Sequence, residues 1–313
     1  GNCQALAPVA EELKQFTIFA TCGTPRIFEE SARKYVFRTM GHATADNVAA
    51  AMYVKEKYPN LKGYTGINQN YAWGQDSWRD FDLTLKQIMP GSSPSDKTQF
   101  PKIFAGQYGS EISAMSLDKA ELIHTSFWGG DLEAFIFQGN ARGLFKKKIG
   151  VFTVGGTAAY RLGKKLPNGL VLGARGPYGI LVRDRDSALN QWFVSTYKNL
   201  YGTYPSGPAY QYGQAILATK IAYDKAGSDA SNEQLADALR GITFESFSTT
   251  IEMSLGNGHQ AATENGYGIT EYDSENGENV VKDVKFYPAS CVLPPEGQNS
   301  VDWIKGGMKG AKC

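Results

Sequence analysis

Residues suited to contacting a small solute stand in this sequence where short apolar runs end. The stretch 62–81 joins an apolar run to a polar loop with Tyr71 and Trp73, and Asp76 and Ser77 follow in the first turn of an expected helix. Free amides at a helix start attract anions, and loop side chains reach over the strand's carboxyl end. No obvious catalytic group stands beside the two rings. The stretch therefore predicts a binding site rather than a catalytic one.

Motifs of the common enzyme classes are absent from the sequence. It has no Walker loop, GxSxG elbow, HExxH helix or GxGxxG fingerprint. The run 155–157 (Gly-Gly-Thr) follows an apolar stretch, but a tight turn explains it better than a phosphate site. His259 lies in a loop-like stretch without a neighbouring cysteine and is expected to be structural. Nothing in the sequence nominates a residue for catalysis.

Residue types typical of binding sites stand at the ends of several apolar runs. These loops are 21–24, 71–74, 127–131 and 153–157. A large ring beside a glycine at a strand-to-loop junction is costly to leave in water, and pockets favour aromatic linings. Trp73 and Trp128 are therefore expected to contact a ligand, although each could pack in a core, as Phe127 is expected to do.

Length and charge narrow the class of protein. A chain of 313 residues is too long for one compact core of ordinary size and predicts two lobes. Its 32 Lys and Arg balance 31 Asp and Glu, which gives a net charge of +1. This balance does not provide the excess of positive charge that is typical of nucleic-acid-binding proteins. The basic run 146–148 is expected to be a solvated helix end. No apolar run approaches the ~20 residues that span a bilayer, so direct membrane insertion is not expected.

The four cysteines fall into two pairs that are close in sequence, Cys3 with Cys22 and Cys291 with Cys313. This clustering favours two local disulfides and an oxidising compartment, although three connectivities are open to four cysteines. The alternative is a metal or redox site. Because CxxC spacing is absent and the histidines are scattered, no metal and no cofactor are expected.

Hydrophobic spacing predicts alternating strands and helices along most of the chain. The predicted helices are 4–13, 44–58, 75–89, 132–145, 190–200, 209–226 and 232–241, and the predicted strands are 16–20, 35–38, 63–67, 122–127 and 149–154. This alternation is typical of a parallel, doubly wound α/β architecture. Beyond Gly241 the pattern favours antiparallel strands, with pieces at 249–253 and 279–287, and an extended tail pinned by Cys291 and Cys313.

The order of these junctions resembles that of type I periplasmic solute-binding proteins of the branched-chain amino acid transporter family. The matching segments are Gly1-Asn2-Cys3-Gln4 at a helix start, Phe19 to Thr24 with its small-residue loop, Tyr35 to Thr39 with the family's Phe-Arg-Thr segment, Tyr71 to Gly74 in place of a Tyr-Gly loop, Tyr212 to Gly227, and Gly258 to Gln260 with the late His-Gln element. The resemblance covers nearly the whole chain. Its specificity comes from the order of the segments and not from any one of them.

The resemblance implies two Rossmann-like lobes joined by a three-segment hinge. The first lobe would comprise 1–39 and 179–265, the second 40–178 and 266–313, with hinges near Thr39, 175–178 and Gly266. The family's opening βα units have no counterpart here, so the first lobe is expected to lack part of its sheet. A partner or an unrecorded segment would then cover the exposed edge.

The resemblance also implies a function without catalysis. The protein would close on a solute in the periplasm and hand it to the membrane permease of an ABC importer. The implied site residues are Asn2, Cys3, Thr21, Gly23, Thr24, Tyr71, Trp73, Trp128, Gly129, Asp131 and Thr153. Amides and hydroxyls near Cys3, Gly23 and Thr24 would hold a carboxylate, and Trp73 and Trp128 would form the opposing wall.

The residue at position 153 bears on the class of solute. Amino-acid binders of this family place an acidic side chain there to pair with the substrate ammonium, whereas Thr153 is uncharged, and an unpaired buried ammonium is costly. With two tryptophans nearby, this favours an aromatic or otherwise amine-free carboxylate. Asp131 could replace the missing acid, so a branched-chain amino acid or an amide stays an alternative. A ligand-sensing receptor ectodomain and a hydrolase with a cysteine nucleophile are further alternatives.

Overall fold

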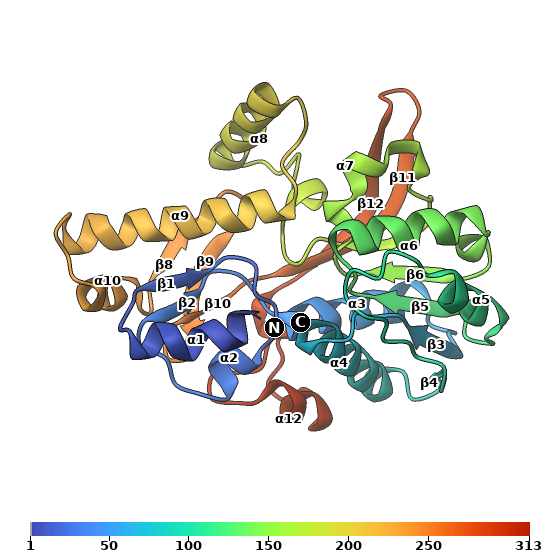
Figure 1. Cartoon of the computed structure of the whole chain (residues 1–313), viewed down its shortest axis with the longest axis horizontal. Coiled ribbons are helices and arrows are strands. Elements are labelled where there is room, and N and C mark those ends of the chain that lie inside the picture. The colour runs from blue at the N-terminus through green and yellow to red at the C-terminus, as the bar shows by residue number, and fades with distance from the viewer. Residues whose placement is uncertain (1) are drawn as a thin grey trace.

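The chain folds around two β-sheets that lie side by side, each with helices on its faces (Figure 1). The computed structural model describes residues 2–313, so Gly1, the first residue of the predicted helix start, lies outside the described residues. The expectation of a two-sheet α/β architecture is confirmed.

The smaller sheet has five strands in the order β1-β2-β10-β9-β8. They are β1 (Thr17–Phe19), β2 (Val36–Arg38), β8 (Thr243–Glu245), β9 (Thr250–Leu255) and β10 (Gln260–Ala262), with α1 (Asn2–Glu12), α2 (Arg26–Glu29), α9 (Gly207–Ala226) and α10 (Asn232–Leu239) around them. β1 and β10 run parallel to β2, whereas β9 runs antiparallel to both β10 and β8. Figure 1 shows α9 on one side of this sheet and α1 on the other.

The larger sheet has seven strands in the order β12-β11-β7-β6-β5-β3-β4. They are β3 (Gly63–Gly66), β4 (Ser93–Pro94), β5 (Leu122–Thr125), β6 (Ile149–Phe152), β7 (Val171–Gly173), β11 (Asn265–Asp273) and β12 (Glu278–Tyr287), with α3 (Ala43–Lys57), α4 (Ala72–Ile88), α5 (Gly109–Leu117) and α6 (Gly129–Ala141) around them. Strands β3 to β7 run parallel to one another, whereas β11 runs antiparallel to its two neighbours, β7 and β12. All residues of β5 are buried, as expected for a central parallel strand covered on both faces.

Local sequence signals explain where several helices begin and end. Pro90 stops α4, and Pro208 stands in the first turn of α9, where its missing amide hydrogen costs nothing. Ser231 and Gln234 form a complete capping box at the start of α10. Along α4 the buried residues Trp73, Ser77, Phe81 and Leu85 are four positions apart, so one helical face packs inward.

The C-terminal segment differs from the extended tail that the sequence suggested. It contains two short helices, α11 (Ala289–Val292) against α3 and α12 (Ser300–Lys305) against α4, and Trp303 and Ile304 are buried. The expected disulfides are present, between Cys3 and Cys22 and between Cys291 and Cys313. Their pairing confirms the local connectivity over the crossed alternatives.

The chain crosses between the two sheets three times. The crossings are 39–42 between β2 and α3, 174–187 between β7 and α8 (Ala188–Tyr201), and 263–264 between β10 and β11. The loops that end β1 and open α3 and α4 are thereby brought to the boundary between the two sheets, where the residues described next meet.

Candidate functional site

Trp73, in the first turn of α4, lies directly against Gly23, in the loop after β1. The indole is only 5% exposed, and a Cβ built on Gly23 would stand 2.2 Å from its Cε3. Ala43 and Val154 complete the buried cluster, and Tyr71 and Trp128 pack against it. Because β1 belongs to one sheet and α4 covers the other, this aromatic cluster spans the boundary between them.

Arg175, in the crossing after β7, covers the cluster. Its guanidinium carbon lies 4.3 Å from the centre of the Trp73 ring, and Nη1 donates to the Thr21 carbonyl at 3.0 Å. Nη2 has no hydrogen-bond partner within residues 2–313 and would lie 2.8 Å from a Cβ on Gly23. The residue adopts a left-handed φ of 60°, which is rare for a non-glycine and is often kept at functional sites.

All four carbonyls of the loop 21–24 are already hydrogen-bonded. Thr21 O accepts from Arg175, Cys22 O and Thr24 O accept from Arg38, and Gly23 O accepts from the Ala43 amide at 2.7 Å. None of the amides of 21–24 donates to another backbone group within residues 2–313. Free amides beside an unpartnered guanidinium nitrogen form a local environment suited to an anion such as a carboxylate.

Two further rings extend the wall beside Trp73. Trp128 is half-buried and donates from Nε1 to the Tyr71 hydroxyl at 2.7 Å, and Phe104 meets its ring edge-on with centroids 5.7 Å apart. Burial raises the pKa of Tyr71 to about 12, so the phenol is neutral at physiological pH. Gly129, which opens α6, has open space where a side chain would stand. These groups can stack on a flat apolar ring and hydrogen bond at its rim.

A family model described as periplasmic binding protein matches residues 1–278, which is most of the chain. This chain belongs to the periplasmic binding protein family. Its arrangement is that of the type I proteins, because the solved structures it resembles include a leucine-binding protein, LivK, from Thermotoga maritima, with a TM-score of 0.69 and 17% identity over 90% of this chain and 75% of that one. No curated protein matches the sequence.

Two solved solute-binding proteins of ABC transporters from Rhodopseudomonas palustris share the fold more fully. The one in complex with 3,4-dihydroxybenzoic acid gives a TM-score of 0.78 at 20% identity over 91% of this chain and 76% of that one. The one in complex with benzoate gives 0.75 at 20% identity over 90% of this chain and 74% of that one. At these identities the likeness establishes the fold.

In this periplasmic binding protein, five of the predicted site residues lie together, namely Thr21, Gly23, Tyr71, Trp73 and Trp128. Thr24 stands beside them, but its hydroxyl donates to Asp76 Oδ2 of α4 at 2.7 Å. The same carboxylate pairs with Arg26 Nη2 at 2.6 Å and Arg79 Nη1 at 2.8 Å. Thr24 therefore helps to hold the loop after β1 against α4.

The other predicted site residues lie farther from the cluster. Asn2 is exposed at the start of α1, and Cys3 is tied to Cys22 by the disulfide. Thr153 is buried and donates to the Thr125 carbonyl at 3.4 Å, while the next residue, Val154, packs on Trp73. Side chains alternate in direction along the end of β6, so Val154 points into the cluster and Thr153, the predicted residue, does not.

Asp131 is fully engaged within its own lobe. Its Oδ2 accepts from Gln69 Nε2 and from the Phe104 amide, both at 2.7 Å, and its Oδ1 accepts from the Gly106 amide at 3.3 Å. A carboxylate with three donors already in place holds the loop at 104–106 against α6. This geometry gives no support to Asp131 as the partner of a substrate ammonium.

Sequence reasoning missed the charged pair that borders the cluster. It treated Arg175 only as part of a hinge and did not consider Asp46 of α3. Asp46 Oδ2 lies 4.0 Å from Arg175 Nε, and its Oδ1 accepts from Asn265 Nδ2 at 2.6 Å. Burial raises the pKa of Asp46 to about 6, and the Arg175 charge opposes this rise. The available signal was an arginine just after an apolar run, between two glycines.

No helix within residues 2–313 combines the length and apolar character that crossing a bilayer requires. Across the same residues, no three His, Cys, Asp or Glu side chains gather where they could hold a metal ion.

Proposed function

We propose that this protein is the solute-binding component of an ABC importer and binds a small aromatic carboxylate between two lobes. The lobes are those expected from the sequence, 1–39 with 179–265 and 40–178 with 266–313. One observation carries the proposal. The Arg175 guanidinium stacks on Trp73 with an unpartnered Nη2, beside a loop whose amides donate to no backbone group within residues 2–313.

The polar groups at the cluster favour a carboxylate over an amino acid. Arginine binds a carboxylate through a planar pair of donors, and the loop amides can add charge-assisted hydrogen bonds. An ammonium group would need an acidic partner, and Asp131 is engaged by its own loop. Asp46 has an Oδ2 without a hydrogen-bond partner within residues 2–313, but Arg175 Nε lies 4.0 Å from it and the Arg175 charge would repel an ammonium. A carboxylate without an amine therefore suits these charges better than leucine does.

The rings at the cluster favour an aromatic body on that carboxylate. Trp73, Trp128 and Tyr71 offer flat apolar surface with polar rims. Because Trp73 lies against Gly23, a solute enters only when the lobes part or the indole turns aside, which is the hinge motion typical of this family's fold. Two of the similar solved proteins carry benzoate and 3,4-dihydroxybenzoic acid, which fits the same solute class.

The proposed setting is the periplasm, with a membrane permease as the partner that receives the solute and with no catalytic step. Two disulfides suit an oxidising compartment. The family assignment supports a binding role rather than an enzymatic one.

Thermal unfolding with a matched panel of ligands tests the proposal. Benzoate, 4-hydroxybenzoate, benzamide and leucine are each added at rising concentration, because a ligand that binds the native state raises Tm by mass action. We expect benzoate and 4-hydroxybenzoate to raise Tm in a saturable way and benzamide and leucine to leave it unchanged. Stabilisation by leucine alone would overturn the solute class.

A further inference from the structure

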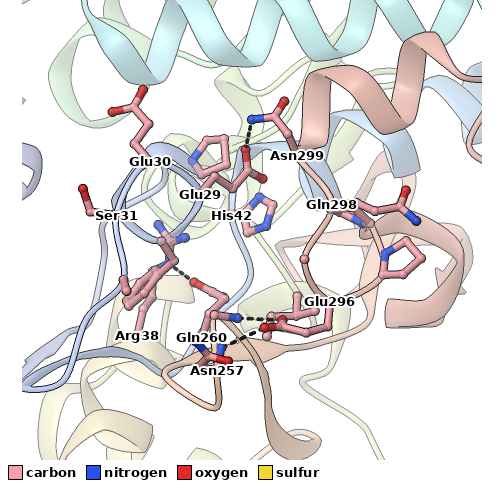
Figure 2. A pocket seen from close by; sticks show the side chains of 18 residues that line it. Glu29, Glu30, Ser31, Arg38, His42, Asn257, Gln260, Glu296, Gln298 and Asn299 are labelled. Carbon is pink, nitrogen blue, oxygen red and sulfur yellow. Dashed lines mark hydrogen bonds between the residues drawn. The ribbon is translucent and has the colours of Figure 1, made fainter.

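A cavity of about 380 Å³ lies between α2, β10 and the C-terminal segment 294–299. Figure 2 shows the polar side chains that border it. Phe28, Pro294 and Pro295 supply apolar wall. No member of the aromatic cluster lines this space, so it is separate from the site described above. We call it the hinge cavity, because Arg38 and His42, which flank the first crossing between the sheets, both line it.

Arg38 is the only arginine or lysine among the described residues that line the hinge cavity. Its side chain is 0% exposed, Nε donates to Gln260 Oε1, and Nη1 donates to the carbonyls of Cys22 at 2.9 Å and Thr24 at 2.6 Å. Nη2 has no hydrogen-bond partner within residues 2–313. Phe28 faces the guanidinium at 5.3 Å, but a ring does not replace a counter-ion. A buried cation of this kind is stabilised by an anion that enters the cavity.

Three carboxylates line the hinge cavity, and none of them hydrogen bonds to Arg38. Glu30 is exposed and accepts from Gln4 Nε2 at 3.4 Å, while the other two hold backbone groups. Glu29 accepts from Asn299 Nδ2 at 3.0 Å and also from the amide and hydroxyl of Ser300. Glu296 accepts from the amides of Gly256 at 2.8 Å and Asn257 at 2.9 Å. Glu29 and Glu296 thus each fix a stretch of backbone at the cavity rim.

His42 adds a second unused polar group. Its Nδ1 has no partner among the described residues, and the side chain is almost fully buried. Burial, together with the Arg38 charge, holds the pKa of His42 well below its usual range, so the ring is neutral. A neutral imidazole can donate to a carboxylate or accept from a hydroxyl on the same ligand. In Figure 2, Arg38, His42 and Gln260 border one continuous space.

We propose that the hinge cavity is a second ligand site and that it takes a small carboxylate, with Arg38 as its anion partner. Nη2, the one nitrogen of Arg38 without a partner among the described residues, donates to the carboxylate, and Phe28 with the two prolines contacts the apolar body. A volume of about 380 Å³ falls within the ordinary range for small-molecule sites and accommodates a single ring.

The hinge cavity is connected to the aromatic cluster through the loop 21–24. The guanidinium that would bind the anion also holds the carbonyls of Cys22 and Thr24. His42 precedes Ala43, whose amide donates to Gly23 O at 2.7 Å and whose side chain packs beside Trp73. A ligand that draws on Arg38 and His42 therefore changes the loop that faces Trp73, and the two sites are expected to alter each other's affinity.

Fluorine NMR of 4-fluorobenzoate with the full chain counts the sites directly. We expect two bound resonances. Ala32→Phe, at an exposed residue on the cavity rim, should remove the hinge resonance and keep the other, whereas Trp128→Ala should do the reverse. The uncharged 4-fluorobenzamide should give no hinge resonance, because it lacks the charge that Arg38 requires.

A charge-retaining variant tests the role of Arg38 itself. Arg38→Lys keeps the positive charge but loses the unpartnered Nη2 donor, so the affinity of the hinge site should fall at least about tenfold. Circular dichroism and Tm establish that the variant is folded. If neither Ala32→Phe nor Arg38→Lys changes any bound resonance, the hinge site is refuted. A resonance lost only in Ala32→Phe, with none lost in Trp128→Ala, would keep the hinge site and contradict the proposed function.

Discussion

Gly23 and Trp73 touch across the boundary between the two sheets, with no room for even one additional carbon between them. A Cβ on residue 23 would stand 2.2 Å from Cε3 and 2.4 Å from Cζ3 of the indole. The absence of a side chain at residue 23 is therefore what lets the loop after β1 close on α4. In the proposed function, the solute enters the space that the indole fills in this structure.

Replacing this glycine should loosen the boundary. In Gly23→Ala the indole or the loop must shift, and overpacking of this kind costs about 1–3 kcal/mol of the free energy of unfolding. We expect a lower Tm and a red-shifted tryptophan emission, because Trp73 becomes more exposed. Gly91→Ala is the control, since residue 91 has open space and no positive φ. Equal losses in both variants would contradict the packing argument.

Asp76 should act as a latch between the lobes. Its fully buried carboxylate accepts from Thr24 and pairs with Arg26 and with Arg79 of its own helix. In Asp76→Asn the arginines lose their counter-charge, which we expect to cost about 2 kcal/mol of unfolding free energy, less than for a fully buried pair since both arginines are partly exposed. Small-angle scattering should show a larger radius of gyration as the lobes part.

The exposed pair of Lys220 and Asp224 on α9 supplies the control for the latch. Asp224→Asn should change the unfolding free energy by less than about 0.5 kcal/mol, because solvent screens such pairs. An effect of Asp76→Asn no larger than this would mean that the buried carboxylate does not hold the lobes together.

The architecture was predictable because its elements carry strong local signals. The helix 44–58 was expected from alanine-rich spacing and is observed as Ala43–Lys57, and the strand 149–154 is observed as Ile149–Phe152. β7 was not expected, because it is only three residues long and ends in Gly173. The C-terminal helices were missed for a related reason. α12 is held by the burial of Trp303 against α4, and tertiary packing of this kind leaves little periodicity in six residues.

The candidate site was predictable in its rings and not in its charges. Trp73 stood beside a glycine at a strand-to-loop junction, which is a local signal, and its partner Gly23 followed from the order of the loops. Arg175 is about a hundred residues from Trp73 in the sequence, and only folding brings the two side chains into contact. The same holds for the engagement of Asp131 by Gln69, which the sequence could not distinguish from a free acid.

Arg175 should set the affinity for the solute. Arg175→Lys keeps the charge but loses the planar donors and much of the stacking on Trp73, so the Kd for benzoate should rise at least about tenfold. Isothermal titration calorimetry measures the change. Arg161→Lys is the control, because that side chain is 63% exposed and lies outside the cluster. Unchanged affinity in Arg175→Lys would place the carboxylate elsewhere.

The two disulfides should contribute equally to stability but differ in their effect on benzoate binding. Each closes a loop of similar length, with sequence separations of 19 and 22, so removal of either should cost roughly 3 kcal/mol of unfolding free energy. Only Cys22 adjoins Gly23, so the double serine variant of Cys3 and Cys22 should also weaken benzoate binding. The variant of Cys291 and Cys313 is its internal control, and an equal loss of affinity in both would show a global effect.

Asp46 should make stability fall as the pH rises through about 6. Burial raises its pKa in the folded state to about 6, from the ordinary value of about 3.9 for an aspartate in an unfolded chain. Between these values the folded protein holds a proton that the unfolded chain has lost, so stability decreases with rising pH, by roughly 3 kcal/mol over the whole window. Asp46→Asn removes this dependence. The Tm of the native protein minus that of the variant should therefore grow as the pH is lowered from 7 to 4.5.

Titration of Asp46 should also change the affinity for the solute. Asp46 Oδ2 lies 4.0 Å from Arg175 Nε. The other polar or charged neighbours of Asp46 are Asn265, Tyr267 and Arg38. Protonation of Asp46 removes the electrostatic attraction between its carboxylate and Arg175, so that Arg175 is more available to a carboxylate ligand. The affinity for benzoate should therefore rise as the pH falls from 7 to 5, until the ligand itself is protonated. Asp80, whose pKa burial also raises to about 6, pairs with Arg79 and does not touch Arg175. Asp80→Asn should therefore keep the pH dependence of benzoate affinity, Asp46→Asn should abolish it, and a flat profile in the native protein would contradict the coupling.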